Sequence, residues 1–228
     1  MTLQQFADEL WLVNGDRIHM LGIPFDTRMC VVRLADGGIW LHSPVAISVE
    51  LIVAVESLGP VRHIVAPNKF HHLFAREWID AFPYATAWAG PGLIERVQTR
   101  FDQELGDQAE ACWGQDIDQL IFGGSRILNE AVFFHRQSRT LILTDIFQNH
   151  APEADNWIWR NLKRLNGIGG PDGGAPRDWR LSVRDRETAR AARDRMLSWD
   201  FDRVVISHGL CIQTGARAQI ERAFAWLG

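Results

Sequence analysis

Short runs of alternating apolar and polar residues occupy the first forty positions of the chain. Leu10–Val13 leads through the turn signal Asn14-Gly15-Asp16 into residues 17–21, and Met29–Leu34 leads through residues 35–38 into Ile39–His42. Apolar alternation broken by Asn-Gly and Gly-Gly turns is typical of antiparallel strands. The chain is therefore predicted to begin as an antiparallel sheet, with residues 17–21 pairing across the turn from Leu10–Val13.

The pattern then changes to one in which helices and strands alternate. Ser48 can cap a helix that carries apolar residues on one face and ends at Gly59-Pro60. A strand over 61–66, a helix from about 72 to 81 and a strand over 85–89 follow. Together with the strand that ends at His42, this order predicts right-handed crossovers and a parallel central section.

The second half of the chain repeats this mixture of strands and helices. Strands are predicted over 118–122, 130–134, 140–144 and 203–207, and helices over 156–165, 184–197 and 215–226. The glycine-rich segment 166–176 lacks the ending of a phosphate-binding loop and is interpreted as a connecting or lid loop. Two mixed halves of this kind predict an α+β fold, an αββα sandwich of two mixed β-sheets flanked by helices, with residues 1–228 as a single domain.

Composition excludes several classes of protein. The 228 residues are 46% hydrophobic and 23% charged, with a net charge of −4 and no Lys/Arg cluster, so no nucleic-acid partner is expected. No apolar run approaches the length of a membrane span, so no membrane partner is expected either. The three widely separated cysteines are typical of reduced thiols in a cytoplasmic protein. The ten tryptophans are interpreted as large rings that fill the core and surface grooves rather than as a platform for sugars or bases.

Candidate metal ligands follow three of the predicted strands. His71 and His72 follow the strand over 61–66, Asp145 follows 140–144, and His208 follows 203–207. Each of them alone could be a cap, a solvated side chain or a backbone contact. Because all occupy the same kind of strand-end position, we expect one shared pocket, into which His42 could also face. Imidazole and carboxylate groups bind Zn, Mn or Fe.

These residues, in this order, resemble the metallo-β-lactamase superfamily. His71-His72 resembles the end of the HxHxDH loop, Asp145 resembles the Asp that bridges two metals, and His208 resembles the last His. The first two motif histidines are replaced within Pro67-Asn68-Lys69. The combination APNxxHH, Glu-x-x-Phe-Phe and Leu-x-Asp is most similar to the DUF4336 family. The resemblance implies the αββα sandwich, and the replaced histidines imply an altered site with one metal ion rather than two.

Two functions remain open on the sequence alone. In the first, His72, Asp145 and His208, with His71 as a further ligand, hold a metal that activates water against a small-molecule ester, thioester, lactone or phosphoester. Asn68 would stabilise the oxyanion, and Glu130 would be a ligand or a base. Lys69 would repel the cation unless it points outward. The alternative is a catalytically silent binding or structural protein of the same fold. The sequence does not indicate the oligomeric state.

Overall fold

Antiparallel strands form one half of the larger sheet, as the alternating pattern predicts. The computed structural model describes residues 1–228 apart from 21, 152, 154–155 and 171. Four strands pair in antiparallel fashion along this half of the sheet: β1 (Leu3–Ala7), β2 (Leu10–Asn14), β5 (Arg28–Arg33) and β6 (Ile39–His42). The sheet continues through parallel strands and comprises seven strands among the residues that the structure describes.

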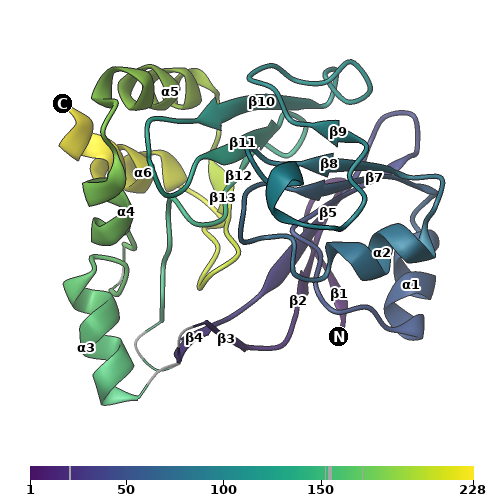
Figure 1. Ribbon diagram of the computed structural model, residues 1–228, viewed down its shortest axis with the longest axis horizontal. Coiled ribbons are helices and arrows are strands. Elements are labelled where there is room, and N and C mark those ends of the chain that lie inside the picture. Colours follow the sequence, from purple (N-terminus) through teal and green to yellow (C-terminus); the bar gives the residue numbers. More distant parts are fainter. Residues whose placement is uncertain (21, 152, 154–155, 171) are drawn as a thin grey trace.

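One predicted pairing at this edge is wrong. β2 pairs with β5 and not with residues 17–21, because the N–H of Gly15 donates to the carbonyl of Thr27 and closes residues 15–27 into an excursion. Within that excursion, β3 (Ile18–Met20) and β4 (Ile23–Phe25) form a separate two-stranded hairpin. Leu21, the end of the predicted strand, lies outside the described residues. The hairpin lies at the lower edge of the view in Figure 1, away from the two sheets. Ile18, Ile23 and Phe25 of the hairpin line the pocket described below.

The parallel section is confirmed. β6, β7 (Val61–Ala66), β8 (Thr86–Ala89) and β9 (Gln103–Glu104) pair in parallel, with α1 (Val49–Glu56), α2 (Ala75–Ala81) and the 3-10 turn η1 (Ile94–Arg96) between them. The Ser48 hydroxyl caps α1 by accepting from the N–H of Leu51 at 3.2 Å. α2 begins three residues later than predicted, because residues 71–74 form turns at the end of the loop that carries the two histidines.

The second sheet contains four strands. β10 (Ile117–Phe122), β11 (Glu130–His135) and β12 (Thr140–Ile142) are antiparallel, and β13 (Arg203–Val205) runs parallel to β12. The helices of this half are α3 (Trp157–Leu165), α4 (Arg177–Ser182), α5 (Arg186–Ser198), α6 (Ala216–Phe224) and the final 3-10 turn η3 (Ala225–Leu227). The sequence pattern did not predict α4, since this six-residue helix is too short to show a helical period.

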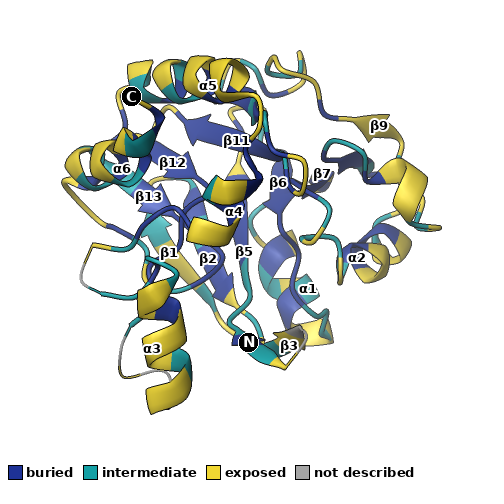
Figure 2. Ribbon diagram, turned by 60° about the vertical axis from the view of Figure 1, so that its left-hand side comes forward, coloured by how far each residue is buried: buried dark blue, intermediate teal, exposed yellow. Residues whose placement is uncertain are grey.

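The two sheets pack face to face and the helices cover their outer faces (Figure 1). The layer between the sheets contains Trp40, Trp88 and Trp113 together with Phe133 and Val205 of the second sheet. α1 and α2 pack on the outer face of the first sheet, and α5 and α6 on that of the second. Figure 2 shows buried strands beneath helices whose outer sides are exposed. The αββα sandwich is thus confirmed, and these three tryptophans are core residues as predicted.

Within the described part of the chain, no helix has the length and apolar character to cross a membrane.

Candidate metal centre

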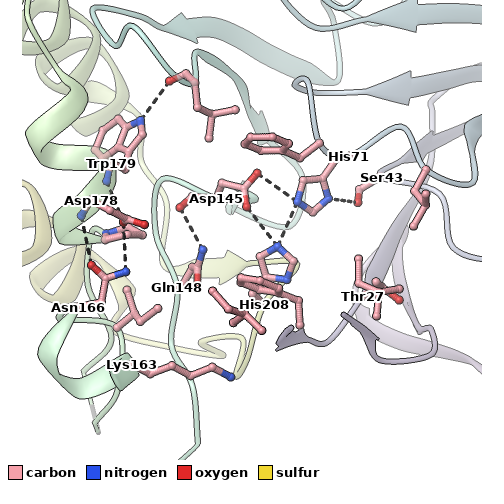
Figure 3. A pocket seen from close by; sticks show the side chains of 18 of the residues that line it. Thr27, Ser43, His71, Asp145, Gln148, Lys163, Asn166, Asp178, Trp179 and His208 are labelled. Atoms are coloured by element: carbon pink, nitrogen blue, oxygen red, sulfur yellow. Dashed lines mark hydrogen bonds and ion pairs between the residues drawn. The ribbon is translucent and has the colours of Figure 1, made fainter. Parts of the chain in front are cut away.

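The ends of parallel strands bring three candidate ligands into one place. His71 lies on the loop after β7, Asp145 follows β12, and His208 follows β13. Parallel neighbours end at the same edge of a sheet, so the loops after β12 and β13 meet there, and the loop after β7 faces them from the opposing sheet. Figure 3 shows the three side chains directed toward one another.

The distances within this group are short and nearly equal. The carboxylate of Asp145 lies with one oxygen 3.2 Å from Nε2 of His71 and with the other 3.2 Å from Nε2 of His208. The two Nε2 atoms lie 3.2 Å from each other. Each residue offers one ligand atom within 4.8 Å of the others, and these three form a potential metal-binding group among the described residues.

The opposite ring nitrogen of each histidine is held by the protein. His208 Nδ1 lies 2.7 Å from the Asp26 carbonyl oxygen, which can only accept, so this nitrogen carries the proton and Nε2 presents a lone pair. His71 Nδ1 lies 2.7 Å from the Ser43 hydroxyl. Partners of this kind fix the ring orientation and the tautomer in metal sites. Both imidazoles are therefore oriented with Nε2 toward Asp145.

Backbone conformation at this edge is unusual at two residues. Ser43, the partner of His71, adopts a φ of 54°, a conformation that costs a non-glycine residue about 1–3 kcal/mol. Gly209, directly after His208, has a φ of 99°, and a Cβ there would clash with the Asn149 carbonyl oxygen. The two residues place the Ser43 hydroxyl and the His208 imidazole in the site.

Asn68 is fully buried and connects the two sheets beneath the group. Its amide nitrogen donates to Asp145 Oδ2 at 2.8 Å and to Thr144 Oγ1 at 2.9 Å, and it also lies 3.2 Å from Glu130 Oε2. Its carbonyl oxygen accepts from the N–H of His71 at 3.1 Å. The predicted oxyanion-stabilising amide is thus engaged in positioning two of the ligands.

Glu130 plays a similar role from β11. One carboxylate oxygen accepts from the N–H of Thr144 at 2.8 Å, and the other accepts from the N–H groups of Asp145 at 2.7 Å and Ile146 at 3.3 Å. The structure places this fully buried carboxylate beneath the loop after β12, outside the group of three. Glu130 therefore holds the backbone that carries Asp145.

Charge at the site is shared between the carboxylates and the imidazoles. Burial alone would raise the pKa of Asp145, but the charges and hydrogen bonds of His71 and His208 hold that pKa far below its ordinary value. Burial acts to lower the pKa of His71, yet the neighbouring Asp145 charge raises it overall. Burial, reinforced by the charge of Asp145, raises the pKa of Glu130. Asp145 is consequently a carboxylate stabilised as the anion.

The donor set fits a divalent metal ion. Ligand atoms around a tetrahedral zinc with bonds of about 2.0–2.1 Å lie about 3.3 Å apart, close to the 3.2 Å between the two Nε2 atoms. Each of these nitrogens lies 3.2 Å from a different oxygen of Asp145. Two imidazoles and a carboxylate, with a fourth position left for water, are also a ligand set of catalytic zinc sites. The same donors suit Mn and Fe, so the set does not select one metal.

Other residues singled out in the sequence lie elsewhere. His72, beside His71, is not in the group; its carbonyl accepts from the N–H of Ala75 while its neighbour turns inward. His42 is buried against Trp40 and Phe133, where burial lowers its pKa to about 3, and it does not line the pocket. Lys69 does not line the pocket either, and its side chain extends to Gly92, where a Cβ would lie 3.7 Å from the Lys69 Cε.

Several residues that support the site carry no signal in the sequence. Ser43 and the Asp26 carbonyl belong to loops that no motif marks, and only the fold brings them against the two imidazoles. A pocket of about 450 Å³ opens beside the group and has walls from β3–β4, α3 and α4, which are distant from the ligands in sequence. Nδ1 of the buried His150 lies 3.1 Å from the Nζ of Lys163, which lines this pocket.

Comparison with solved structures identifies the fold. The chain is similar over 99% of its length to a metallo-beta-lactamase from Pontibacter korlensis, with 14% identity, 98% of that chain covered and a TM-score of 0.65. A metallo-beta-lactamase from Hirschia baltica gives 13% identity, 99% and 96% coverage and a TM-score of 0.65. The Flv1 flavodiiron core from Synechocystis sp. PCC6803 gives 12% identity and a TM-score of 0.66, with 99% of this chain and 60% of that chain covered. The fold is that of the metallo-β-lactamase superfamily.

A family model identifies the chain more narrowly than the fold does. The model of the domain of unknown function DUF4336 matches residues 7–156, so the chain belongs to this family. No curated protein matches the chain. The expected resemblance to DUF4336 is thereby confirmed.

Proposed function

We propose that the protein is a metal-dependent hydrolase with one metal ion held by His71, Asp145 and His208. The observation that carries the proposal is the convergence of two oriented Nε2 atoms on one carboxylate at 3.2 Å. The fold supports it, since metallo-β-lactamases of known structure share it. This ligand set replaces the one centred on His72.

A single ion is favoured by the surroundings of the group. His71, Asp145 and His208 form the candidate group found among the described residues. Asn68 lies in the segment where the first two histidines of the resembled motif are replaced. Its amide nitrogen is engaged by Thr144, Asp145 and the Glu130 carboxylate. It is therefore a structural residue in this site, and the sequence offers no second set of ligands beside it.

The chain's own groups would support hydrolysis in the following way. His71, Asp145 and His208 would hold the ion, which would supply Lewis-acid activation of a water molecule and of the substrate carbonyl. The Asp26 carbonyl keeps a proton on Nδ1 of His208, and the Ser43 hydroxyl orients the His71 ring, so that both Nε2 atoms would face a bound ion. The network of Asn68 and Glu130 fixes Asp145, and the apolar pocket wall offers a surface for the rest of a substrate.

Metal analysis by plasma mass spectrometry tests the proposal. We expect about one equivalent of Zn, Mn or Fe in the wild type after reconstitution, and its loss in His71→Ala, Asp145→Asn and His208→Ala. His72→Ala is the matched control, because its imidazole lies one residue from His71 but outside the group, and it should keep the metal.

An activity screen on metal-loaded protein then follows, with Asp145→Asn as the blank. No metal in the reconstituted wild type would overturn the proposal and leave the alternative of a silent binding protein. Metal that persists in His71→Ala but is lost in His72→Ala would restore the ligand set expected from the sequence.

A further inference from the structure

The pocket beside the candidate metal centre has two chemically different ends. Ser43, His71, Asp145 and His208 line one end. Trp179, Asp178 and Asn166 lie across the pocket from Ser43 (Figure 3). The volume of about 450 Å³ is within the range of about 300–1,000 Å³ found for small-molecule pockets. A ligand can therefore place a reacting group at the metal end and extend well beyond it.

The wall between these ends is predominantly apolar. More than half of the lining side chains are hydrocarbon or aromatic, and they come from six separate parts of the chain. They include Phe25, Phe70, Leu128, Trp159, Leu162 and Trp179. The Trp179 indole N–H donates to the Leu128 carbonyl at 3.1 Å, so this ring presents an apolar surface to the pocket. Such a wall stabilises a hydrocarbon chain by removing it from water.

Charges in the wall argue against an anionic substrate. Asp145 and Asp178 are the carboxylates of the pocket, and Lys163 is its one amine among the described lining residues. Lys163 Nζ is engaged with His150 at 3.1 Å, and Asp178 with Asn166 at 3.1 Å. His71 and His208 already pair with Asp145, so a phosphoester would find little further cationic compensation in the described wall, whereas a neutral acyl group needs none.

We propose that the substrate is a neutral carboxylic ester or thioester whose apolar acyl chain occupies this pocket. The reaction rests on the proposed function, whereas acyl-chain binding rests on the pocket alone. Hydrolysis adds water across the acyl bond: the acyl carbon takes the hydroxyl, the C–O or C–S bond breaks, and the alcohol or thiol leaves with the proton. The products are a carboxylic acid and that alcohol or thiol.

Binding is tested first, with primary amides that keep the acyl chain and resist hydrolysis. Acetamide, hexanamide and octanamide are titrated by calorimetry into wild-type protein and into Asp145→Asn. Each buried methylene contributes about 0.8 kcal/mol, so octanamide should bind about fifteenfold more tightly than hexanamide. Asp145→Asn should show the same dependence on chain length, because it alters the metal end and not the wall.

Two leucines of α3 provide a matched pair of variants. Leu162 lines the pocket and is 47% exposed, while Leu165 on the same helix is 66% exposed and does not line it. Both sites are exposed enough for an aspartate to be tolerated. Leu162→Asp should weaken octanamide binding by about tenfold or more through loss of apolar contact, and Leu165→Asp should leave it unchanged.

Turnover is measured in parallel on metal-loaded protein. Nitrophenyl esters from acetyl to octanoyl should show kcat/KM rising with chain length, and a nitrophenyl phosphodiester should be hydrolysed far more slowly. Equal binding of the three amides, or equal weakening by both leucine variants, would overturn the proposal. Amide binding as expected with no ester turnover would refute the hydrolase and retain the acyl pocket. Turnover that is independent of chain length would retain the hydrolase and refute this substrate class.

Discussion

Replacing Glu130 with glutamine tests the claim that a buried carboxylate holds the loop of Asp145. The two Glu130 oxygens accept hydrogen bonds from three consecutive backbone N–H groups, those of residues 144–146, at 2.7–3.3 Å. They also receive the Asn68 amide at 3.2 Å. Glutamine has the same shape but one acceptor oxygen and one donor group. In either orientation its NH₂ faces at least one backbone N–H.

The magnitude follows from these contacts. A buried donor left without a partner costs about 1–3 kcal/mol, and hydrogen bonds to a charged group contribute about 1.5–3 kcal/mol each. Removing the buried charge offsets part of the loss, because burial and the Asp145 charge already raise the pKa of Glu130. We expect Glu130→Gln to lower the free energy of unfolding by about 2–3 kcal/mol. For a chain of this size that is a fall in Tm of about 4–12 °C.

The assay is urea denaturation followed by tryptophan fluorescence, with the metal affinity measured on the same samples. The midpoint should fall with an unchanged m value. The metal affinity should fall by about 10–100-fold, as for other residues that orient metal ligands. Glu56→Gln on the exposed surface of α1 is the matched control and should change stability by less than about 0.5 kcal/mol.

Two results would refute the reasoning about Glu130. A change in unfolding free energy as small as that of Glu56→Gln would mean that the hydrogen bonds to the loop after β12 do not hold it. Full stability combined with complete loss of metal would indicate that Glu130 binds the ion itself, contrary to its position outside the group of three.

Three further predictions concern the supports of the site and the buried histidines. Ser43→Ala should lower metal affinity about 10–100-fold with Tm preserved, because it removes the partner of His71 Nδ1; unchanged affinity by metal titration would contradict this. Gly209→Ala should cost about 3 kcal/mol in urea denaturation, since it combines a φ of 99° with a clash, whereas Gly215→Ala, in open space, should cost clearly less. Burial lowers the pKa of both His63 and His135 to about 4, so the folded state stays neutral while the unfolded state protonates below pH 6.5. The free energy of unfolding should be highest above that pH and fall by about 3 kcal/mol per histidine as the pH drops to about 4. Denaturation of His63→Asn and His135→Asn at several pH values should give a flatter dependence of this free energy on pH.

The order and type of most elements were determined by the sequence alone. Apolar alternation and helical periodicity are local, and they placed the antiparallel start, the parallel section through β8 and the helices α3, α5 and α6 close to their observed bounds. The positions of Asp145 and His208 at strand ends were also readable, because parallel strands must end at a common edge. These features depend on neighbours within a few residues.

Tertiary structure decided which of the adjacent histidines faces the site. His71 is held inward by Ser43 and by the Asn68 carbonyl, and His72 is not in the group, a choice that no local pattern contains. The roles of Asn68 and Glu130 depend on a contact between residues 62 positions apart. The pocket likewise joins β3–β4 to α3 and α4. Such contacts are set by the packing of the two sheets, whereas a sequence pattern reports only the period of a single element.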